Sequence, residues 1–274
     1  MVAEATTYRY IRFALLALLL MLTISVAAET VRTGWQTSIS GYYYTAAGPV
    51  FVGVLSAVGV CLLALRGFTD AENVCLNLAG ISAPMVAFVP TPAVGHHPDV
   101  HAIVNNALSF LVVLAIGYVV VLVVLLRRRA AGWPTRWGLV GLVATALAWA
   151  VGMAWILIDR TSFAAHAHAL AAIFTFVPFA GVVVLNTDWG VRVVAGEAGA
   201  SRTRFDAAYW WVVGGMALVV VVFAALWRWR FALLGVEVGL LVLFVVFWML
   251  QTIDLIDPER DLAVTAGARP GVPG

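Results

Sequence analysis

Residues 103–126 read IVNNALSFLVVLAIGYVVVLVVLL and contain no charged side chain. A stretch of this length and polarity predicts a segment that crosses a membrane, because spanning the hydrocarbon layer takes about 20 apolar residues. Backbone polar groups must be paired within lipid, so the predicted segment is a helix. The arginines Arg127, Arg128 and Arg129 follow directly and mark one end of the span.

Similar stretches recur along the whole chain, and they predict an all-α fold, a polytopic transmembrane helix bundle of about eight spans. The spans are expected near residues 10–28, 50–65, 74–89, 103–126, 138–158, 163–185, 207–227 and 231–251. The chain is 63% hydrophobic and 11% charged, whereas about 25% of residues in soluble domains are charged. We expect residues 1–252 to form this single bundle and residues 253–274 to form a flexible cytoplasmic tail.

Arginine placement predicts the orientation of the bundle. The chain has no lysine, so all 16 basic residues are arginines. The eight-span threading puts twelve of them on one side and four on the other, and the positive-inside rule then places both termini in the cytoplasm. We therefore expect a multi-pass protein of a prokaryotic plasma membrane, with lipids as partners. The net charge of +2 reflects this asymmetry and implies no nucleic-acid partner.

Two alternatives to this threading concern the first and the last spans. Residues 10–28 resemble a cleavable signal peptide, because Arg9 and Arg12 precede an apolar run that ends at Val26-Ala27-Ala28. The run is long for a signal peptide, which favours a retained span. Residues 207–251 could instead form one re-entrant pair. The segment Trp227–Arg230 argues against that pair, because Trp and Arg anchor helix ends at the membrane interface.

All five histidines and Glu237 are predicted to lie toward the outer side of the membrane. Glu237 is the seventh residue of the last predicted span, so it lies about 9–10 Å below the outer boundary. Ionisable groups at such depth are candidates for functional sites. His101 opens the fourth span, and Asn105 and Ser109 share its helix face at i+4 and i+8. The predicted lining of an outward-facing polar cavity comprises Ser38, Tyr43, His101, Asn105, Ser109, His166 and Glu237.

Two kinds of chemistry are open to this set. Histidine and carboxylate ligands suit zinc, whose bound water can attack an ester or amide, and the candidate ligands are His101, His166 and His168. A histidine beside a buried glutamate suits a proton relay instead. The sequence contains no HExxH motif, and the i, i+2 spacing of His166 and His168 turns at most one of them toward a shared cavity. No metal or other cofactor is therefore assigned, and the simplest interpretation of His96 and His97 is a solvated loop.

A second polar group is expected at the cytoplasmic end. Asp70, Asn73 and Asn77 are spaced i, i+3 and i+7, so they share one helix face. Arg66 precedes them, and Gln251 closes the last span at the same level. The favoured interpretation is a network that locks helix ends together, and the alternative is the inner gate of a transporter. We find no inverted repeat between the two halves of the chain, which disfavours a repeat-built transporter.

Several short segments also carry a family resemblance. They are Thr37–Tyr44 (TSISGYYY), Val50–Gly53, Gly67–Asp70, Glu72-Asn73, Asn77–Gly80, Phe88–Thr91 and Val100-His101. Together they resemble a bacterial multi-pass membrane family of unknown function, distantly similar to the DRAM/Sfk/FGF-receptor-activating membrane proteins. The resemblance covers residues 37–109, with a weaker match at Glu237 and residues 247–252. It implies importance for Ser38, Tyr43, Asp70, Asn73, Asn77, His101 and Glu237, and it implies no reaction.

The layout is also loosely similar to that of alkaline ceramidases and adiponectin receptors, which hold zinc with three histidines. Their C-terminal HxxxH is missing here, and Asp70 is predicted on the opposite side from the histidines. The favoured hypothesis is thus a non-enzymatic membrane protein that binds or transports a lipid or small solute. A metal-dependent lipid hydrolase and a structural or partner-binding role are the alternatives.

Overall fold

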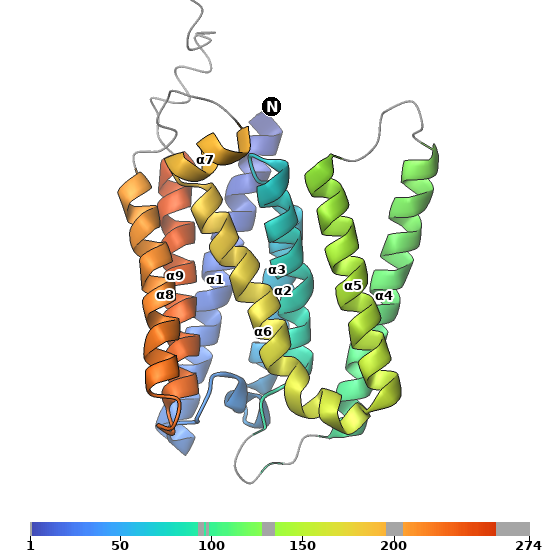
Figure 1. The fold of residues 1–274 in the computed structure, drawn as a ribbon. Helices are drawn as coiled ribbons and strands as arrows, with labels where there is room; N and C mark the ends of the chain where they lie inside the picture. Colours follow the sequence, from blue (N-terminus) through green and yellow to red (C-terminus); the bar gives the residue numbers. More distant parts are fainter. Residues whose placement is uncertain (1, 93–95, 97–98, 128–134, 196–204, 256–274) are drawn as a thin grey trace, which may run out of the picture.

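The computed structural model describes residues 2–92, 96, 99–127, 135–195 and 205–255, and over these residues the regular elements are helices (Figure 1). They are α1 (Val2–Thr33), the 3-10 helix η1 (Ser40–Tyr44), α2 (Gly48–Ala64), α3 (Asp70–Phe88), α4 (Val100–Arg127), α5 (Arg136–Ile158), α6 (Arg160–Leu185), α7 (Asp188–Ala195), α8 (Asp206–Ala225) and α9 (Ala232–Leu255). Within the described ranges, seven helices are long and apolar enough to cross a membrane. The 17-residue α2 is near the lower limit for a span.

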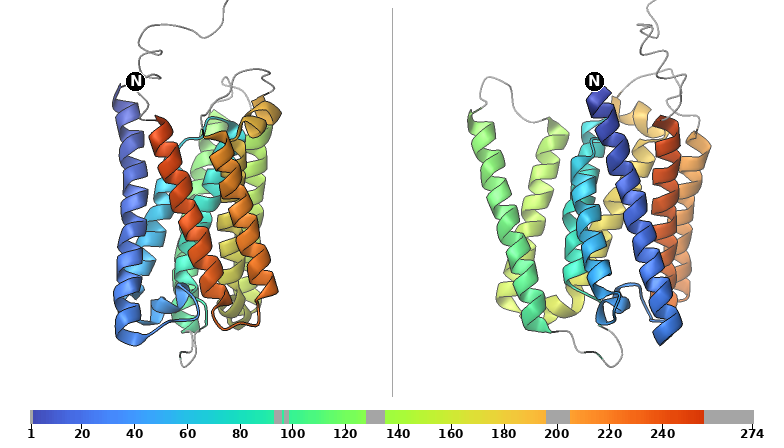
Figure 2. Two further views of the ribbon diagram at one scale, coloured as in Figure 1. Left: turned by 90° about the vertical axis from the view of Figure 1, so that its left-hand side faces the viewer. Right: turned by 180° about the vertical axis from the view of Figure 1, so that it is seen from behind.

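The eight long helices run back and forth between the two ends of the bundle (Figures 1 and 2). The start of α1 and the end of α9 lie at the same end, which we call the terminal end, and we call the other the far end. Helices α3 and α6 pack against each other in the middle. Helices α1, α8 and α9 lie on one side of this pair and α4 and α5 on the other (Figure 1).

Helix boundaries differ from the sequence prediction in two places. The third span begins at Asp70 rather than near residue 74, because the Thr69 hydroxyl caps the helix by accepting the Glu72 amide at 3.1 Å. The short helix α7 lies within a segment that was expected to be a plain connection. Residues 207–251 contain two antiparallel helices, α8 and α9, as the favoured threading predicts. Of the predicted tail, residues 256–274 lie outside the described residues.

The buried apolar side chains form two separate cores. The larger core joins α1, α2, α3, α6, α8 and α9, and its centre holds Phe179, Phe247 and Trp248, each no more than 1% exposed. The smaller core joins α4, α5 and α6 at the far end around Ile103, Ile156 and other side chains. Toward the terminal end, α4 and α5 present mostly exposed apolar side chains. Helix α4 is thus packed chiefly at the far end, whereas α5 also contacts α3 near the terminal end, where Gly141 lies against Val74.

Helices α2 and α3 approach each other at a pair of glycines. Pro84 has no amide hydrogen, so the Gly80 carbonyl lacks its usual helical partner, and this carbonyl points at Gly59. A Cβ atom added at Gly59 would lie 2.6 Å from the Gly80 oxygen and 2.8 Å from the Pro84 ring. Only glycine allows this approach without moving the backbone, as in other close-packed membrane helices.

We therefore expect Gly59→Ala to lower the free energy of unfolding by about 1–3 kcal/mol, the usual cost of overpacking. Gly53→Ala is the matched control, because a Cβ at Gly53 of the same helix meets no atom within 4 Å. Thermal unfolding in detergent, followed by tryptophan fluorescence, compares the two. Equal stability of both variants would contradict the close contact between α2 and α3.

Candidate functional site

Glu237 of α9 holds the segment before η1 at the far end of the bundle. Its Oε2 atom accepts a hydrogen bond from the backbone amide of Ile39. Its Oε1 atom lies 3.5 Å from the Ser40 hydroxyl, which also donates to the Thr91 hydroxyl at 2.6 Å. The Leu234 amide, on the first turn of α9, donates to the Thr37 carbonyl at 3.0 Å. One carboxylate therefore joins α9 to a segment almost 200 positions earlier in the chain.

His168 of α6 is the ionisable partner of Glu237. Its ring is 7% exposed, and its Nδ1 atom lies 2.7 Å from the Val89 carbonyl oxygen. A carbonyl oxygen can only accept, so Nδ1 must carry the hydrogen, and Nε2 is left to face the carboxylate. Nε2 lies 3.7 Å from Glu237 Oε1. The contact therefore links α6 to α9 at the far end.

The η1 segment is itself well fastened at the far end. Ser38 is only 1% exposed, and its hydroxyl accepts a hydrogen bond from the Gly41 amide at 2.9 Å. The Tyr42 hydroxyl is hydrogen-bonded to Thr30 of α1. Burial raises the pKa of the Tyr44 phenol above its ordinary value, and the neighbouring Tyr43 adds to the effect. We call Ser38, Ser40, Thr91, His168 and Glu237 the far-end cluster, a set of packed and hydrogen-bonded side chains.

The structure separates the other predicted outer residues from this cluster. His101, Asn105 and Ser109 do share one face of α4, but that face is exposed, and Ser109 donates to the Asn105 carbonyl of its own helix. His166 is also exposed and bonds to the Ser162 carbonyl one turn earlier. Of the two neighbouring histidines, it is His168 that turns inward. Tyr43 is half-buried with its ring edge-on to Tyr44 and makes no hydrogen bond to Glu237.

The proposed zinc ligands are likewise not gathered. His101 and His166 are exposed, whereas His168 is buried beside Glu237. Over the described ranges, no three His, Cys, Asp or Glu side chains come close enough to hold one metal ion. His97 lies outside the described residues.

A buried chain of hydrogen bonds crosses four helices near the terminal end. Arg12 of α1 donates to Gln251 Oε1 of α9 at 2.5 Å, and Gln251 Nε2 donates to Asn186 Oδ1 at 2.9 Å. Asn186, the residue that ends α6, donates in turn to Glu72 Oε1 of α3 at 2.8 Å. Because arginine only donates and a carboxylate only accepts, the two amides must both point from the cation toward the anion. We call these four residues the terminal-end network.

Each member of this network is at most 8% exposed, and Arg12 also stacks over the Trp248 ring with its guanidinium carbon 5.2 Å from the ring centre. The sequence analysis identified only Gln251 of the four. The missed signal was an arginine inside the first predicted span, which we counted as a flanking charge. Glu72 and Asn186 were overlooked because they adjoin predicted span ends, where polar residues are common.

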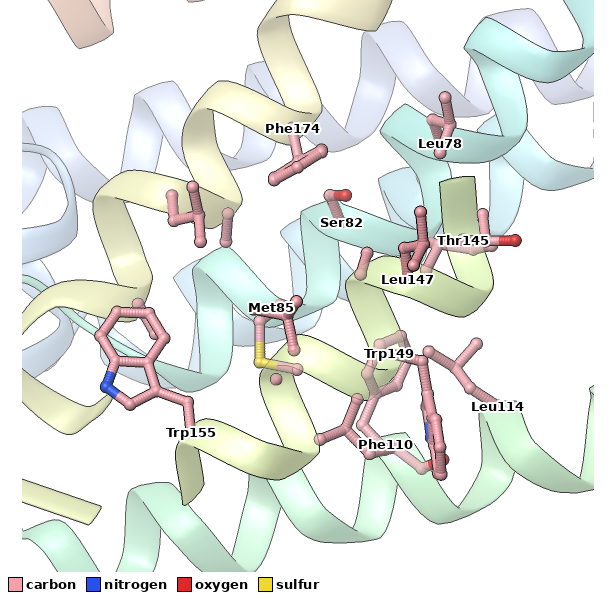
Figure 3. Close-up of a pocket in the computed structure, with 18 of the residues that line it drawn as sticks. Leu78, Ser82, Met85, Phe110, Leu114, Thr145, Leu147, Trp149, Trp155 and Phe174 are labelled. Atoms are coloured by element: carbon pink, nitrogen blue, oxygen red, sulfur yellow. The ribbon is translucent and has the colours of Figure 1, made fainter. Parts of the chain in front are cut away.

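Two cavities lie on the other side of α3, toward α4 and α5. The first is an apolar cavity of about 370 Å³ between α3, α4, α5 and α6, and Figure 3 shows its lining. Aromatic rings and aliphatic side chains dominate the lining, with Ser82 and Thr145 as the hydroxyl groups. Leu147, Val151, Leu170 and Phe174 line it and are also 38–60% exposed, so it opens sideways between α5 and α6.

The second cavity, of about 440 Å³, lies between α3, α4 and α5 toward the terminal end. It receives three residues of the predicted inner set, namely Asp70, Asn73 and Asn77. The two cavities share Ile81, Leu114 and Thr145 in their linings. They are therefore neighbours, and we call them together the groove. Its lining is mostly apolar, and three polar side chains, Asp70, Asn73 and Asn77, enter it toward the terminal end.

The predicted inner set is thus divided between two places. Gln251 belongs to the terminal-end network, whereas Asp70, Asn73 and Asn77 face the groove. Arg66 is exposed between α2 and α3 and forms no ion pair with Asp70. Asn73 is anchored, because its Oδ1 atom accepts the Gly67 amide at 2.7 Å. That bond leaves the NH₂ group of Asn73 free to donate to a ligand.

The chain matches no protein-family model, and neither curated proteins nor solved structures show significant similarity to it.

Proposed function

We propose that this chain is an integral membrane protein that binds a lipid in the groove, with the polar end of the lipid toward Asp70 and the hydrocarbon chain between α5 and α6. The observation that carries the proposal is the division of the groove into a polar and an apolar part. A lipid has a polar headgroup and an apolar chain in the same order, whereas a polar solute would leave the apolar part of the groove unfilled. The single-site cavity expected around His101 and Glu237 supplies less support, because its members are dispersed.

Dimensions support a lipid as the occupant. The apolar part of the groove extends along α5 from Ala144 to Trp155, which is about 17 Å at the helical rise of 1.5 Å per residue. One leaflet of the hydrocarbon layer is about 15 Å thick. The apolar part therefore matches the length of one acyl chain, and its lining of aromatic and aliphatic side chains is typical of apolar ligand sites.

Orientation supports the same arrangement. The positive-inside rule puts the arginine-rich terminal end in the cytoplasm, and Asp70 stands at that end of α3. The polar end of the occupant is then on the cytoplasmic side, and its hydrocarbon chain extends toward the far end. The resemblance to a family of bacterial multi-pass proteins is compatible with such a role and remains a prediction.

Filling the groove tests the proposal. Ala148 of α5 lines the apolar part, whereas Ala150 of the same helix is exposed and does not. We expect Ala148→Phe to reduce photocrosslinking of a diacyl lipid with a diazirine in its chain by about tenfold, equal to about 1.4 kcal/mol. Ala150→Phe is the control and should leave crosslinking unchanged.

Crosslinked peptides locate the lipid independently. In the wild type they should contain Trp149, Phe110 or Phe174, which face the groove in Figure 3. Equal labelling of the Ala148→Phe and Ala150→Phe variants, or labels spread evenly over the exposed face of α4, would refute lipid binding in the groove.

A further inference from the structure

We infer that the polar end of the groove selects a headgroup that carries a cationic amine. The inference rests on the proposed function and concerns the chemistry of the ligand at Asp70, Asn73 and Asn77. It extends that proposal from lipids in general to one class of headgroup.

Charge is the first argument. Asp70 is the only acidic side chain in the described lining of the polar end, and no arginine or histidine lines it. A phosphate or other anionic group placed there alone would meet a like charge without a counter-ion. An ammonium group would instead form a charge-assisted hydrogen bond, which is about twice as strong as a neutral one.

The amide of Asn77 is the second argument. Asn77 follows Asp70 by seven residues, so it lies about 10 Å further into the bundle at the helical rise. Its side chain is exposed to the groove and has no hydrogen-bond partner among the residues that the structure describes. This amide can both donate and accept, so it can pair with a polar ligand atom that reaches this depth.

The donors and acceptors fit the same ligand. Asp70 offers only acceptors, Asn73 offers its free NH₂ group, and Asn77 offers both kinds of group. An amine can donate to Asp70 while an ester or phosphate oxygen of the same lipid accepts from Asn73 or Asn77. Asp70 thus matches the amine of such a lipid, and Asn73 and Asn77, further along α3, match the region that links its headgroup to the acyl chains.

The test compares two lipids that share acyl chains and differ in the headgroup. Native mass spectrometry of the purified full chain measures binding of phosphatidylethanolamine and phosphatidylglycerol. We expect the wild type to prefer the amine-bearing lipid by about tenfold, equal to about 1.4 kcal/mol. Asp70→Asn should abolish the preference, and Asp70→Glu, which keeps the charge, should retain it.

The ratio of the two lipids separates recognition from folding, because loss of stability lowers the binding of both. A wild type without preference for the amine, or a preference unchanged in Asp70→Asn, overturns the headgroup inference. Lipid binding in the groove would still stand if Ala148→Phe reduced the binding of both lipids. A last measurement adds free ethanolamine at millimolar concentration and asks whether it displaces the bound lipid. If it displaced the lipid completely, the ligand would be a small amine and the lipid assignment would fail.

Discussion

Replacement of Glu72 by alanine is expected to lower the free energy of unfolding by about 3–5 kcal/mol, the usual effect of removing one partner of a buried charge pair. Glu72 is 3% exposed and accepts from Asn186 at 2.8 Å and from the Phe68 amide at 2.7 Å. Without it, Arg12 remains buried with no opposite charge in the network. The amides of Asn186 and Gln251 then lose the anion that aligns them.

Thermal unfolding in detergent measures this effect, and the expected fall in Tm is about 10 °C, since 1 kcal/mol shifts Tm by about 2–4 °C in chains of this size. Glu72→Gln is the matched control, because it keeps an acceptor for Asn186 and should lose less. The double variant Arg12→Met with Glu72→Leu removes both charges together and should recover much of the stability. If the double variant lost as much free energy of unfolding as Arg12→Met and Glu72→Leu lose together, Arg12 and Glu72 would not be coupled.

Replacement of Glu237 by alanine is expected to lower the free energy of unfolding by about 2–3 kcal/mol, because it leaves a buried amide and an imidazole nitrogen without partners. The amide is that of Ile39, whose residue is 8% exposed, and the imidazole is that of His168. The loss should be local, because the Glu237 side chain fastens the start of η1. Hydrogen exchange of residues 36–45 should rise more than exchange in α8.

Two variants control for this result. Glu237→Gln keeps an oxygen that can accept from Ile39 and should lose less than half as much stability. Val238→Ala alters the neighbouring residue, which is 43% exposed on α9, and should leave exchange at η1 unchanged. Exchange of residues 36–45 as slow in Glu237→Ala as in the wild type would show that the carboxyl group does not hold the η1 segment.

The sequence predicts the helices well because each span needs a long apolar stretch, which is visible without knowledge of its neighbours. The all-helical bundle was therefore predictable, as was the antiparallel order of α8 and α9. The capped start of α3 was also readable, because Thr69-Asp70-Ala71-Glu72 has the S/T-x-x-E pattern of a helix N-terminus, and the span prediction missed it by following hydropathy alone. The predicted face of Asn105 and Ser109 exists, but helical spacing does not say which way a face points.

The candidate site was only partly predictable for the same reason. Glu237 was predicted from its depth in the last span and from the family resemblance, and the structure supplies its partner, His168. The i, i+2 spacing of His166 and His168 predicts that the two rings diverge, yet it cannot choose between them. Arg12 and Asn186 illustrate the opposite case. Their roles depend on the close approach of α1, α9 and α6, which no periodicity within a single helix encodes.

The sideways opening of the groove between α5 and α6 has a consequence for how a ligand would enter. Leu170 and Phe174 at this opening belong to neither buried core, so they can move aside without unfolding the bundle. A lipid would then enter sideways from the bilayer, past Leu170 and Phe174, and never pass through water. Occupancy would follow the mole fraction of that lipid in the surrounding leaflet, so the protein would respond to membrane composition rather than to any dissolved concentration.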